Sequence, residues 1–283
     1  MKIAFIDHHL ENFHANTFQK ILRDKTLIPQ DVIIGGWELE EAGEDWCAKH
    51  NVLRLHSLED ALEWADRVMV LSPDNLDCHF SLAQQVLPAG LPTFFDKMLA
   101  PTIDDAEQIV ELASRYKAPV FSSSGLSFAV ELGPATDLKG EGSIHDVFVG
   151  GMGGWLGYGI HTLSMALTLM GSAIVRLIDT GTHGARTVTI DYGGGSRAVV
   201  DVRTCANEYE ASPWRFIART DTKSAAGVVT AYADFYVRLI QHVVEFFSGA
   251  DAALSLHDSL TAVKVLNLAD ISLQRGGEWV ALR

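Results

Sequence analysis

The fold is decided at the start of the chain, by Lys2-Ile-Ala-Phe-Ile-Asp7 and the polar stretch His8-His9-Leu10-Glu11-Asn12 that follows it. An unbroken apolar run between a lysine and an aspartate predicts a strand buried on both faces, as in a parallel sheet. From Asn12 to Asp24, apolar residues recur at helical spacing, and Asn12 is a candidate N-cap. The sequence therefore opens with a strand, a polar loop and a helix.

The same alternation continues through the first 130 residues. Short apolar runs predict six strands, at residues 2–7, 32–35, 53–55, 66–72, 92–95 and 120–123. Helix-length amphipathic segments lie between most of them, among them residues 40–50 and 102–116. Ser57-Leu-Glu-Asp60 matches a capping box, so Ser57 is a candidate N-cap of a further helix. Strands that alternate with helices predict an α/β fold, here a Rossmann-like doubly wound parallel sheet.

Beyond that point the pattern becomes that of an antiparallel sheet. Strand-like segments occur at residues 175–179, 187–192, 197–203 and 214–219, and the turn Gly193-Gly-Gly-Ser196 joins two of them. Two long helices, near 231–247 and 256–275, follow. We therefore predict a nucleotide-binding-type domain over residues 1–125 and an α+β domain over 126–283, with the option that the final helix packs back on the first domain.

Composition excludes several classes of protein. With 283 residues, of which 48% are hydrophobic and 20% charged, the chain has ample material for a globular core. Its net charge of −14 disfavours nucleic acid, which is bound mainly by Lys and Arg, and favours a small-molecule ligand. The three cysteines form no CxxC pair, and no apolar run approaches the ~18 residues of a membrane span. We expect a cytoplasmic protein that does not contact a membrane.

The loop after the first strand lacks the glycines of a dinucleotide-binding loop. Glycines at that point let the backbone approach a pyrophosphate, whereas this loop carries side chains, with acids at Asp7 and Glu11. Together with His8, His9 and His14 these acids could bind a metal ion. The alternative is a polar loop that leads into a helix. Because adjacent histidines do not easily point at one ion, no metal site is predicted.

Candidate reactive groups follow the fourth and fifth strands. The fourth ends in Ser72-Pro73-Asp74-Asn75, with His79 in the next helix, and the fifth ends in Asp96-Lys97-Met98. Ligands of doubly wound sheets bind at the carboxyl ends of the strands, where a lysine can donate or accept a proton. The alternative is a surface lysine in a loop. At the end of the second strand, Glu38 is the acid that would contact a ribose hydroxyl, which favours NAD.

Residues 71–129 resemble the Gfo/Idh/MocA family of sugar and polyol oxidoreductases. The resemblance rests on Pro73, Asn75 and His79, on Ala89-Gly90-Leu91-Pro92, and on Asp96-Lys97-Met98. Further along, Gly157-Tyr-Gly-Ile-His161-Thr-Leu-Ser164 is similar to the family's Asp-x-Gly-x-His-x-x-Asp helix, with glycine and serine in place of the two acids. Similarity continues to the C-terminal helices, so it covers nearly the whole chain.

The resemblance implies an NAD(P)-dependent oxidoreductase that acts on a sugar, inositol or related polyol, as a homodimer or homotetramer. Lys97 would contact substrate and nicotinamide, and His161 would exchange a proton with the substrate hydroxyl, for which imidazole is suited near pH 7. The expected cofactor-binding residues are Asp7, His8, Glu38, Ser72, Pro73, Asn75, His79 and Asp96. Trp155 and Tyr158 are candidates to stack on a sugar face, the alternative being a place in the core.

Two questions stay open in the sequence. The missing glycines and acids leave room for a non-redox descendant, either a ligand-binding or regulatory protein or a lyase or isomerase that uses Lys97 and His161 for proton transfer alone. The second glycine-rich stretch, Gly150–Gly159, is not preceded by a first strand and is no phosphate loop. It predicts close backbone packing or a mobile loop.

Overall fold

A computed structural model describes residues 1–41, 43–140 and 142–282 of the chain. It divides into two compact units, one of Met1–Ser123 with Tyr236–Leu260, the other of Ser124–Phe235 with Thr261–Arg283. Each unit contains one sheet, and together they confirm the predicted class of a parallel doubly wound domain followed by an α+β domain. Among the described residues, no helix is long and apolar enough to cross a membrane.

The sheet of the first unit has six parallel strands in the order β3-β2-β1-β4-β5-β6, which is the order of dinucleotide-binding sheets. The strands are β1 (Lys2–Asp7), β2 (Ile33–Glu38), β3 (Leu53–Arg54), β4 (Arg67–Val70), β5 (Thr93–Phe95) and β6 (Val120–Ser122). The apolar run of β1 is fully buried because neighbouring strands flank it on both sides and helices cover both faces. The strand order reverses between β1 and β4, so the crevice for a ligand lies at their carboxyl ends.

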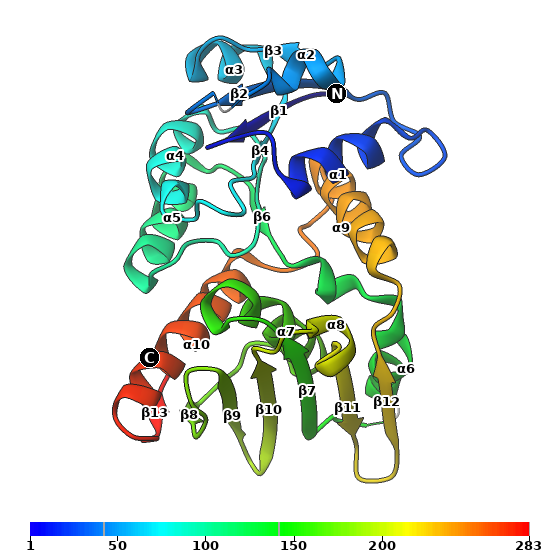
Figure 1. Ribbon diagram of the computed structural model, residues 1–283, viewed down its shortest axis with the longest axis vertical. Coiled ribbons are helices and arrows are strands. Elements are labelled where there is room, and N and C mark those ends of the chain that lie inside the picture. Colours follow the sequence, from blue (N-terminus) through cyan, green and yellow to red (C-terminus); the bar gives the residue numbers. More distant parts are fainter. Residues whose placement is uncertain (42, 141, 283) are drawn as a thin grey trace. The chain divides into compact units, whose positions relative to one another are not determined.

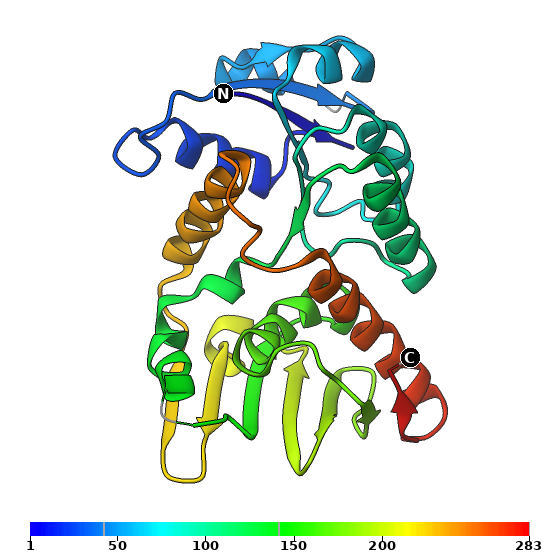
Figure 2. The same cartoon turned by 180° about the vertical axis from the view of Figure 1, so that it is seen from behind.

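The helices of this unit are α1 (Phe13–Arg23), α2 (Trp46–His50), α3 (Leu58–Trp64), α4 (Cys78–Val86), α5 (Ile103–Tyr116) and most of α9 (Tyr232–Phe247), with the short 3-10 helix η1 (Leu87–Ala89). Predicted caps are confirmed at α1, where Asn12 accepts from Ala15 N, and at α3, where Ser57 accepts from Asp60 N. Both ribbon views show α9 alongside α1 (Figures 1 and 2), where the rings of Phe13 and Tyr236 are 5.5 Å apart.

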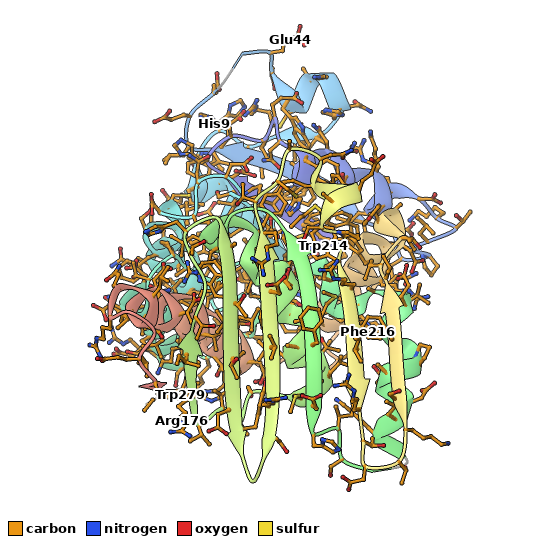
Figure 3. All side chains as sticks on the ribbon, turned by 60° about the horizontal axis from the view of Figure 1, so that its bottom comes forward. His9, Glu44, Arg176, Trp214, Phe216 and Trp279 are labelled. Atoms are coloured by element: carbon orange, nitrogen blue, oxygen red, sulfur yellow. The ribbon has the colours of Figure 1, made fainter. Side chains whose placement is uncertain are left out.

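The second unit contains a seven-stranded sheet in the order β12-β11-β7-β10-β9-β8-β13. Its strands are β7 (Asp146–Met152), β8 (Arg176–Asp179), β9 (Ala185–Gly193), β10 (Ser196–Arg203), β11 (Arg215–Arg219), β12 (Ser224–Val228) and β13 (Val280–Ala281). All pairs are antiparallel except β7 with β10. At the β8–β13 edge the guanidinium of Arg176 lies 4.4 Å from the ring centre of Trp279 (Figure 3).

Helices α7 (Trp155–Met170) and α10 (Leu256–Gln274) are the long helices of this part of the chain, and α7 packs on β7 and β10. The shorter helices are η2 (Gly125–Phe128), η3 (Val130–Leu132), α6 (Gly133–Asp137), η4 (Leu138–Gly140) and α8 (Glu208–Ala211). The second glycine-rich stretch is no mobile loop, because it forms the end of β7 and the start of α7. Close packing is the correct alternative, since a Cβ on Gly151 would lie 2.0 Å from Thr162 Oγ1 of α7.

This contact predicts the effect of a methyl group in β7. Gly151→Ala should destabilise the protein by about 1–3 kcal/mol, because α7 or the ring of Trp214 must move to admit the added carbon. Urea unfolding followed by circular dichroism measures the change. Gly157→Ala is the matched control, since a Cβ there meets no described atom within 4 Å apart from its chain neighbours and the backbone of its own helix. Equal stability of the two variants would contradict the packing argument.

Candidate active site

The loop between β1 and α1 is closed by hydrogen bonds to its neighbours. Its first three N–H groups donate to side chains of the same unit: His8 N to Ser72 Oγ at 2.9 Å, His9 N to Asp7 Oδ1 at 3.2 Å, and Leu10 N to Glu38 Oε2 at 2.9 Å. In a glycine-rich loop such groups are left free for a pyrophosphate. Here the side chains of this unit use them instead.

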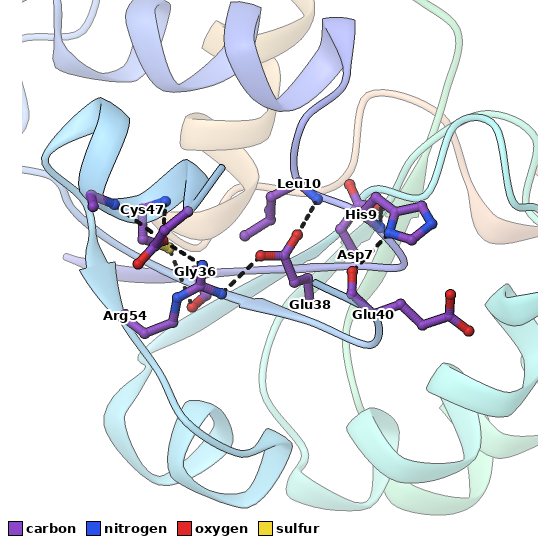
Figure 4. Close-up of polar contacts among 10 residues, drawn as sticks. Asp7, His9, Leu10, Gly36, Glu38, Glu40, Cys47 and Arg54 are labelled. Carbon is purple, nitrogen blue, oxygen red and sulfur yellow. Dashed lines mark hydrogen bonds and ion pairs between the residues drawn. The ribbon is translucent and has the colours of Figure 1, made fainter. Parts of the chain in front are cut away.

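Glu38 is buried at the end of β2 and links two loops. One carboxylate oxygen accepts from Leu10 N and the other from Arg54 Nη1 at 2.9 Å (Figure 4). Arg54 in turn reaches Asp45, the N-cap of α2. The carboxylate expected to contact a ribose hydroxyl thus has a protein partner on each oxygen, and in this structure Glu38 positions the β1–α1 loop.

Asp7 ends β1 and is 1% exposed. Burial raises its pKa to about 7, although hydrogen bonds from Asn12 Nδ2, at 2.8 Å, and from Ser72 and His9 favour the charged form. A carboxyl group with such a pKa is neutral in about half of the molecules at pH 7. The β1–α1 loop therefore carries less negative charge at pH 7 than full ionisation of Asp7 and Glu11 would give. The second of these acids, Glu11, is paired with Lys49 at 2.8 Å.

The turn after β4 contains Ser72, Pro73 and Asn75. Ser72 is buried with a φ of 37°, and Asn75 N donates to Ser72 O at 3.2 Å, which closes the turn. Pro73 and Asn75 are half-buried. Within the described residues the side-chain amide of Asn75 makes no hydrogen bond, so this amide is available to a ligand at the carboxyl end of β4.

His79 is fully buried in α4 and faces two carbonyl oxygens. Nε2 lies 3.1 Å from Leu71 O and Nδ1 lies 3.1 Å from Leu99 O. Burial lowers the pKa of His79, which favours the neutral imidazole, despite the opposing effect of the two carbonyls. The ring joins the end of β4 to the segment after β5. We therefore assign His79 a positioning role, because its ring nitrogens are directed at backbone on both sides.

Asp96 holds the backbone that carries Lys97. It is fully buried, with Oδ1 accepting from Lys97 N at 2.8 Å and Oδ2 bonded to His14 Nδ1. Burial alone would raise the pKa of Asp96, but the charge and hydrogen bond of His14 hold it below its usual value. His14, which the sequence places near His8 and His9 of the loop, thus binds Asp96 in the segment after β5. Lys97 is half-buried, and its ammonium makes no hydrogen bond or ion pair with any described residue.

The candidate proton acceptor of the second unit is His161 in α7. It is buried, and its Nδ1 lies 2.7 Å from Ser124 Oγ. When Nδ1–H donates to this hydroxyl, Nε2 carries the lone pair that accepts a proton. Ser124, 37 residues away in sequence, was not identified from the sequence. Ser164, where the resembling family has an acid, donates to Ile160 O of its own helix at 2.7 Å.

Aromatic rings surround His161. Tyr158 and Trp214 approach it edge-on, with ring centres at 5.6 and 5.8 Å, and Tyr209 and Tyr232 pack on Trp214. Trp214 Nε1 is buried and unpaired within the described chain. Tyr158 is 44% exposed, which suits the stacking role predicted for it. The structure gives Trp155 a place in the core, where Nε1 donates to Leu266 O at 3.0 Å and Arg186 covers the ring.

The imidazole rings of His8 and His9 lie closer together than we expected of two histidines adjacent in sequence. Their ring centres are 4.2 Å apart, and Glu40 completes a group of three potential metal ligands. Adjacency in sequence therefore does not prevent the two histidines from facing one ion, which corrects the reason given against it.

Residues 10–124 match a family model described as an oxidoreductase family with an NAD-binding Rossmann fold, Gfo/Idh/MocA. Over this segment the chain is similar to the Rossmann domain of that family. The match confirms the resemblance drawn from the sequence, and it begins at Leu10, after His8 and His9. A search of curated proteins gives no significant match.

Solved structures share the fold over the whole chain. A probable dehydrogenase from Thermotoga maritima has a TM-score of 0.84 at 16% identity, covering 99% of this chain and 98% of its own. GenD2 from gentamicin A biosynthesis, in complex with NAD, has 0.83 at 16%, covering 100% and 96%. A myo-inositol dehydrogenase from Corynebacterium glutamicum has 0.81 at 13%, covering 100% and 99%.

The cofactor of the Gfo/Idh/MocA family fits one part of this Rossmann domain better than the other. At the ends of β4 and β5, the Asn75 amide and the Lys97 ammonium are available to the polar groups of a nicotinamide nucleotide. After β1, three loop N–H groups are bonded to protein, so the usual contact of backbone with pyrophosphate is not available there. A phosphate at this position needs another source of positive charge.

The His14–Asp96 pair predicts a large loss of stability when one partner is removed. His14→Ala should cost about 3–5 kcal/mol, because it leaves the buried carboxylate of Asp96 without its counter-charge. Urea unfolding measures the loss, and Arg115→Ala, in the exposed Arg115–Glu111 pair, should cost less than about 1 kcal/mol. Adding Asp96→Asn to His14→Ala should recover part of the stability. No recovery would show that ring packing, and not charge, explains the loss.

Proposed function

We propose that this protein is an NAD(P)-dependent oxidoreductase that acts on a sugar, inositol or related polyol. The observation that carries the proposal is the Lys97 ammonium at the end of β5, without a hydrogen-bonding partner among the described residues. Its backbone is held by buried Asp96, and the buried ring of His79 reaches Leu99 O just beyond it. Such preorganisation around one free cation is typical of a catalytic group. It occurs on a domain of an NAD-binding oxidoreductase family.

Oxidation of a secondary alcohol requires loss of the hydroxyl proton while hydride leaves the carbon, and a bound NAD(P)⁺ supplies the hydride acceptor. His161 takes the proton on Nε2, and Ser124 holds the tautomer in which Nε2 is basic. The ammonium of Lys97 donates a hydrogen bond to the substrate oxygen and stabilises the negative charge that develops there. The exposed ring of Tyr158 offers a surface for the C–H face of a sugar ring.

One observation favours a second candidate function. The closed loop after β1 leaves few free N–H groups for a pyrophosphate. A protein with this loop could keep Lys97 and His161 for proton transfer alone, as a lyase or isomerase on a related substrate. The two functions differ in whether a dinucleotide binds.

Cofactor binding distinguishes these functions. Titration with NADH and with NADPH, followed by the fluorescence of the reduced nicotinamide, should show saturable binding in the micromolar range for at least one of them. NADH is the expected preference, because Glu38 at the end of β2 is the kind of residue that contacts the ribose 2′-hydroxyl of NAD. Absence of binding for both cofactors would reject the oxidoreductase and favour the lyase or isomerase.

The proposed roles of Lys97 and His161 predict the effect of their removal. Lys97→Met and His161→Asn should each lower kcat for polyol oxidation by about 10²–10⁴-fold, as expected for loss of a proton-transfer or charge-stabilising group. Initial rates of NADH formation measure this, with the unfolding midpoint as a check on folding. Lys20→Met and His183→Asn, at exposed positions, are the matched controls. Variants at Lys97 or His161 with the rates of their controls would exclude those residues from the chemistry.

A further inference from the structure

We propose that His8, His9 and Glu40 form a binding site for a divalent transition-metal ion of the Zn²⁺ class. One potential ligand atom from each of the three side chains lies within 4.8 Å of the others. Around a tetrahedral zinc ion, ligand atoms are about 3.4 Å apart, given metal–ligand distances near 2.0–2.1 Å. The separation of His8 Nε2 from a Glu40 carboxylate oxygen is 3.8 Å, which is close to that spacing.

The sheet brings the three residues together. His8 and His9 follow β1 directly, and Glu40 lies two residues beyond β2, while β1 and β2 pair in parallel up to Asp7 and Glu38. The pairing continues past the strand ends, because Leu39 N donates to Asp7 O at 2.9 Å and Glu40 N donates to His8 O at 3.1 Å. The backbone on both sides of the group is therefore fixed by the sheet.

His9 makes the hydrogen bond that metal-ligating histidines commonly make. His9 Nδ1 lies 2.7 Å from the carbonyl oxygen of Glu40, as Figure 4 shows. A ring that donates Nδ1–H to a carbonyl presents Nε2 as the ligand atom, which is the common arrangement at zinc sites. In the described chain neither ring nitrogen of His8 makes a hydrogen bond, so Nε2, which faces the Glu40 carboxylate, is available to bind an ion.

The donor set selects the kind of ion. Two imidazoles and one carboxylate suit Zn²⁺ and its first-row neighbours, whereas Mg²⁺ and Ca²⁺ prefer oxygen ligands alone. Three protein ligands leave a fourth position for water or for an anionic oxygen. With one negative ligand, a bound divalent ion gives the group a charge of about +1. On the proposed function, this is the positive charge for a pyrophosphate that the loop N–H groups do not supply.

Calorimetric titration of the EDTA-treated and dialysed protein with Zn²⁺ tests the site. One equivalent should bind with a dissociation constant in the micromolar range or below, and Glu40→Gln and His9→Ala should each weaken binding at least about tenfold. The Glu40 side chain is 67% exposed, so Glu40→Gln leaves the fold intact. Glu41→Gln and His56→Ala, exposed residues outside the group, are the matched controls and should bind as the wild type does.

Substitution with Co²⁺ identifies the ligands by absorption. Visible d–d bands without a thiolate charge-transfer band are expected, because the cysteines Cys47, Cys78 and Cys205 are outside the group. Failure to bind Zn²⁺, a thiolate band, or equal affinity of the Glu40→Gln and Glu41→Gln variants would each overturn the site.

A separate NADH titration tests the role toward phosphate. Tighter NADH binding with Zn²⁺ present, lost in Glu40→Gln, is expected if the ion contacts the cofactor. NADH binding that does not respond to Zn²⁺ would remove this role. Zn²⁺ binding without NADH binding would leave the metal site in place and reject the proposed oxidoreductase.

Discussion

A buried carboxylate, that of Asp96, is the constraint on which the candidate site depends. A fully buried charge is costly unless it is paired and hydrogen-bonded, and Asp96 meets both conditions through His14 and the N–H of Lys97. This arrangement joins α1, through His14, to the segment that follows β5, where Asp96 also binds the backbone N–H of Lys97. The backbone of Lys97, whose ammonium has no hydrogen-bonding partner among the described residues, is therefore held by a buried carboxylate.

The β1–α1 loop shows how a Rossmann sheet can be combined with a loop that contains no glycine. Hydrogen bonds that a pyrophosphate would otherwise receive are made instead to Ser72, Asp7 and Glu38. Asp7 ends β1, Glu38 ends β2 and Ser72 lies two residues beyond β4, so the loop ties β1 to β2 and β4 at the edge where ligands bind. Side-chain acceptors thereby stabilise the loop in the absence of any ligand.

Much of the fold could be predicted from local patterns, and much of the site could not. All six parallel strands and the caps at Asn12 and Ser57 follow from apolar runs and side-chain chemistry over a few residues. Strand β7 was missed because its glycines resemble a loop. Close approach of Thr162 in α7 explains Gly151, and close approach of Arg215 in β11 explains Gly150. The His14–Asp96 and Ser124–His161 pairs join residues 82 and 37 positions apart. A local sequence pattern cannot predict pairs so far apart, because the residues come together only when the chain has folded.

The division of the chain has a consequence for its synthesis. The first unit consists of residues 1–123 and 236–260, and residues 124–235 of the second unit lie between these segments in sequence. Helix α9 supplies Tyr236, which packs against Phe13 and Phe18 of α1. The ribosome must therefore produce the whole intervening segment before the apolar face of α1 is covered. An N-terminal fragment ending at residue 123 would present that face to solvent or to chaperones, so the first unit reaches its native packing only late in translation.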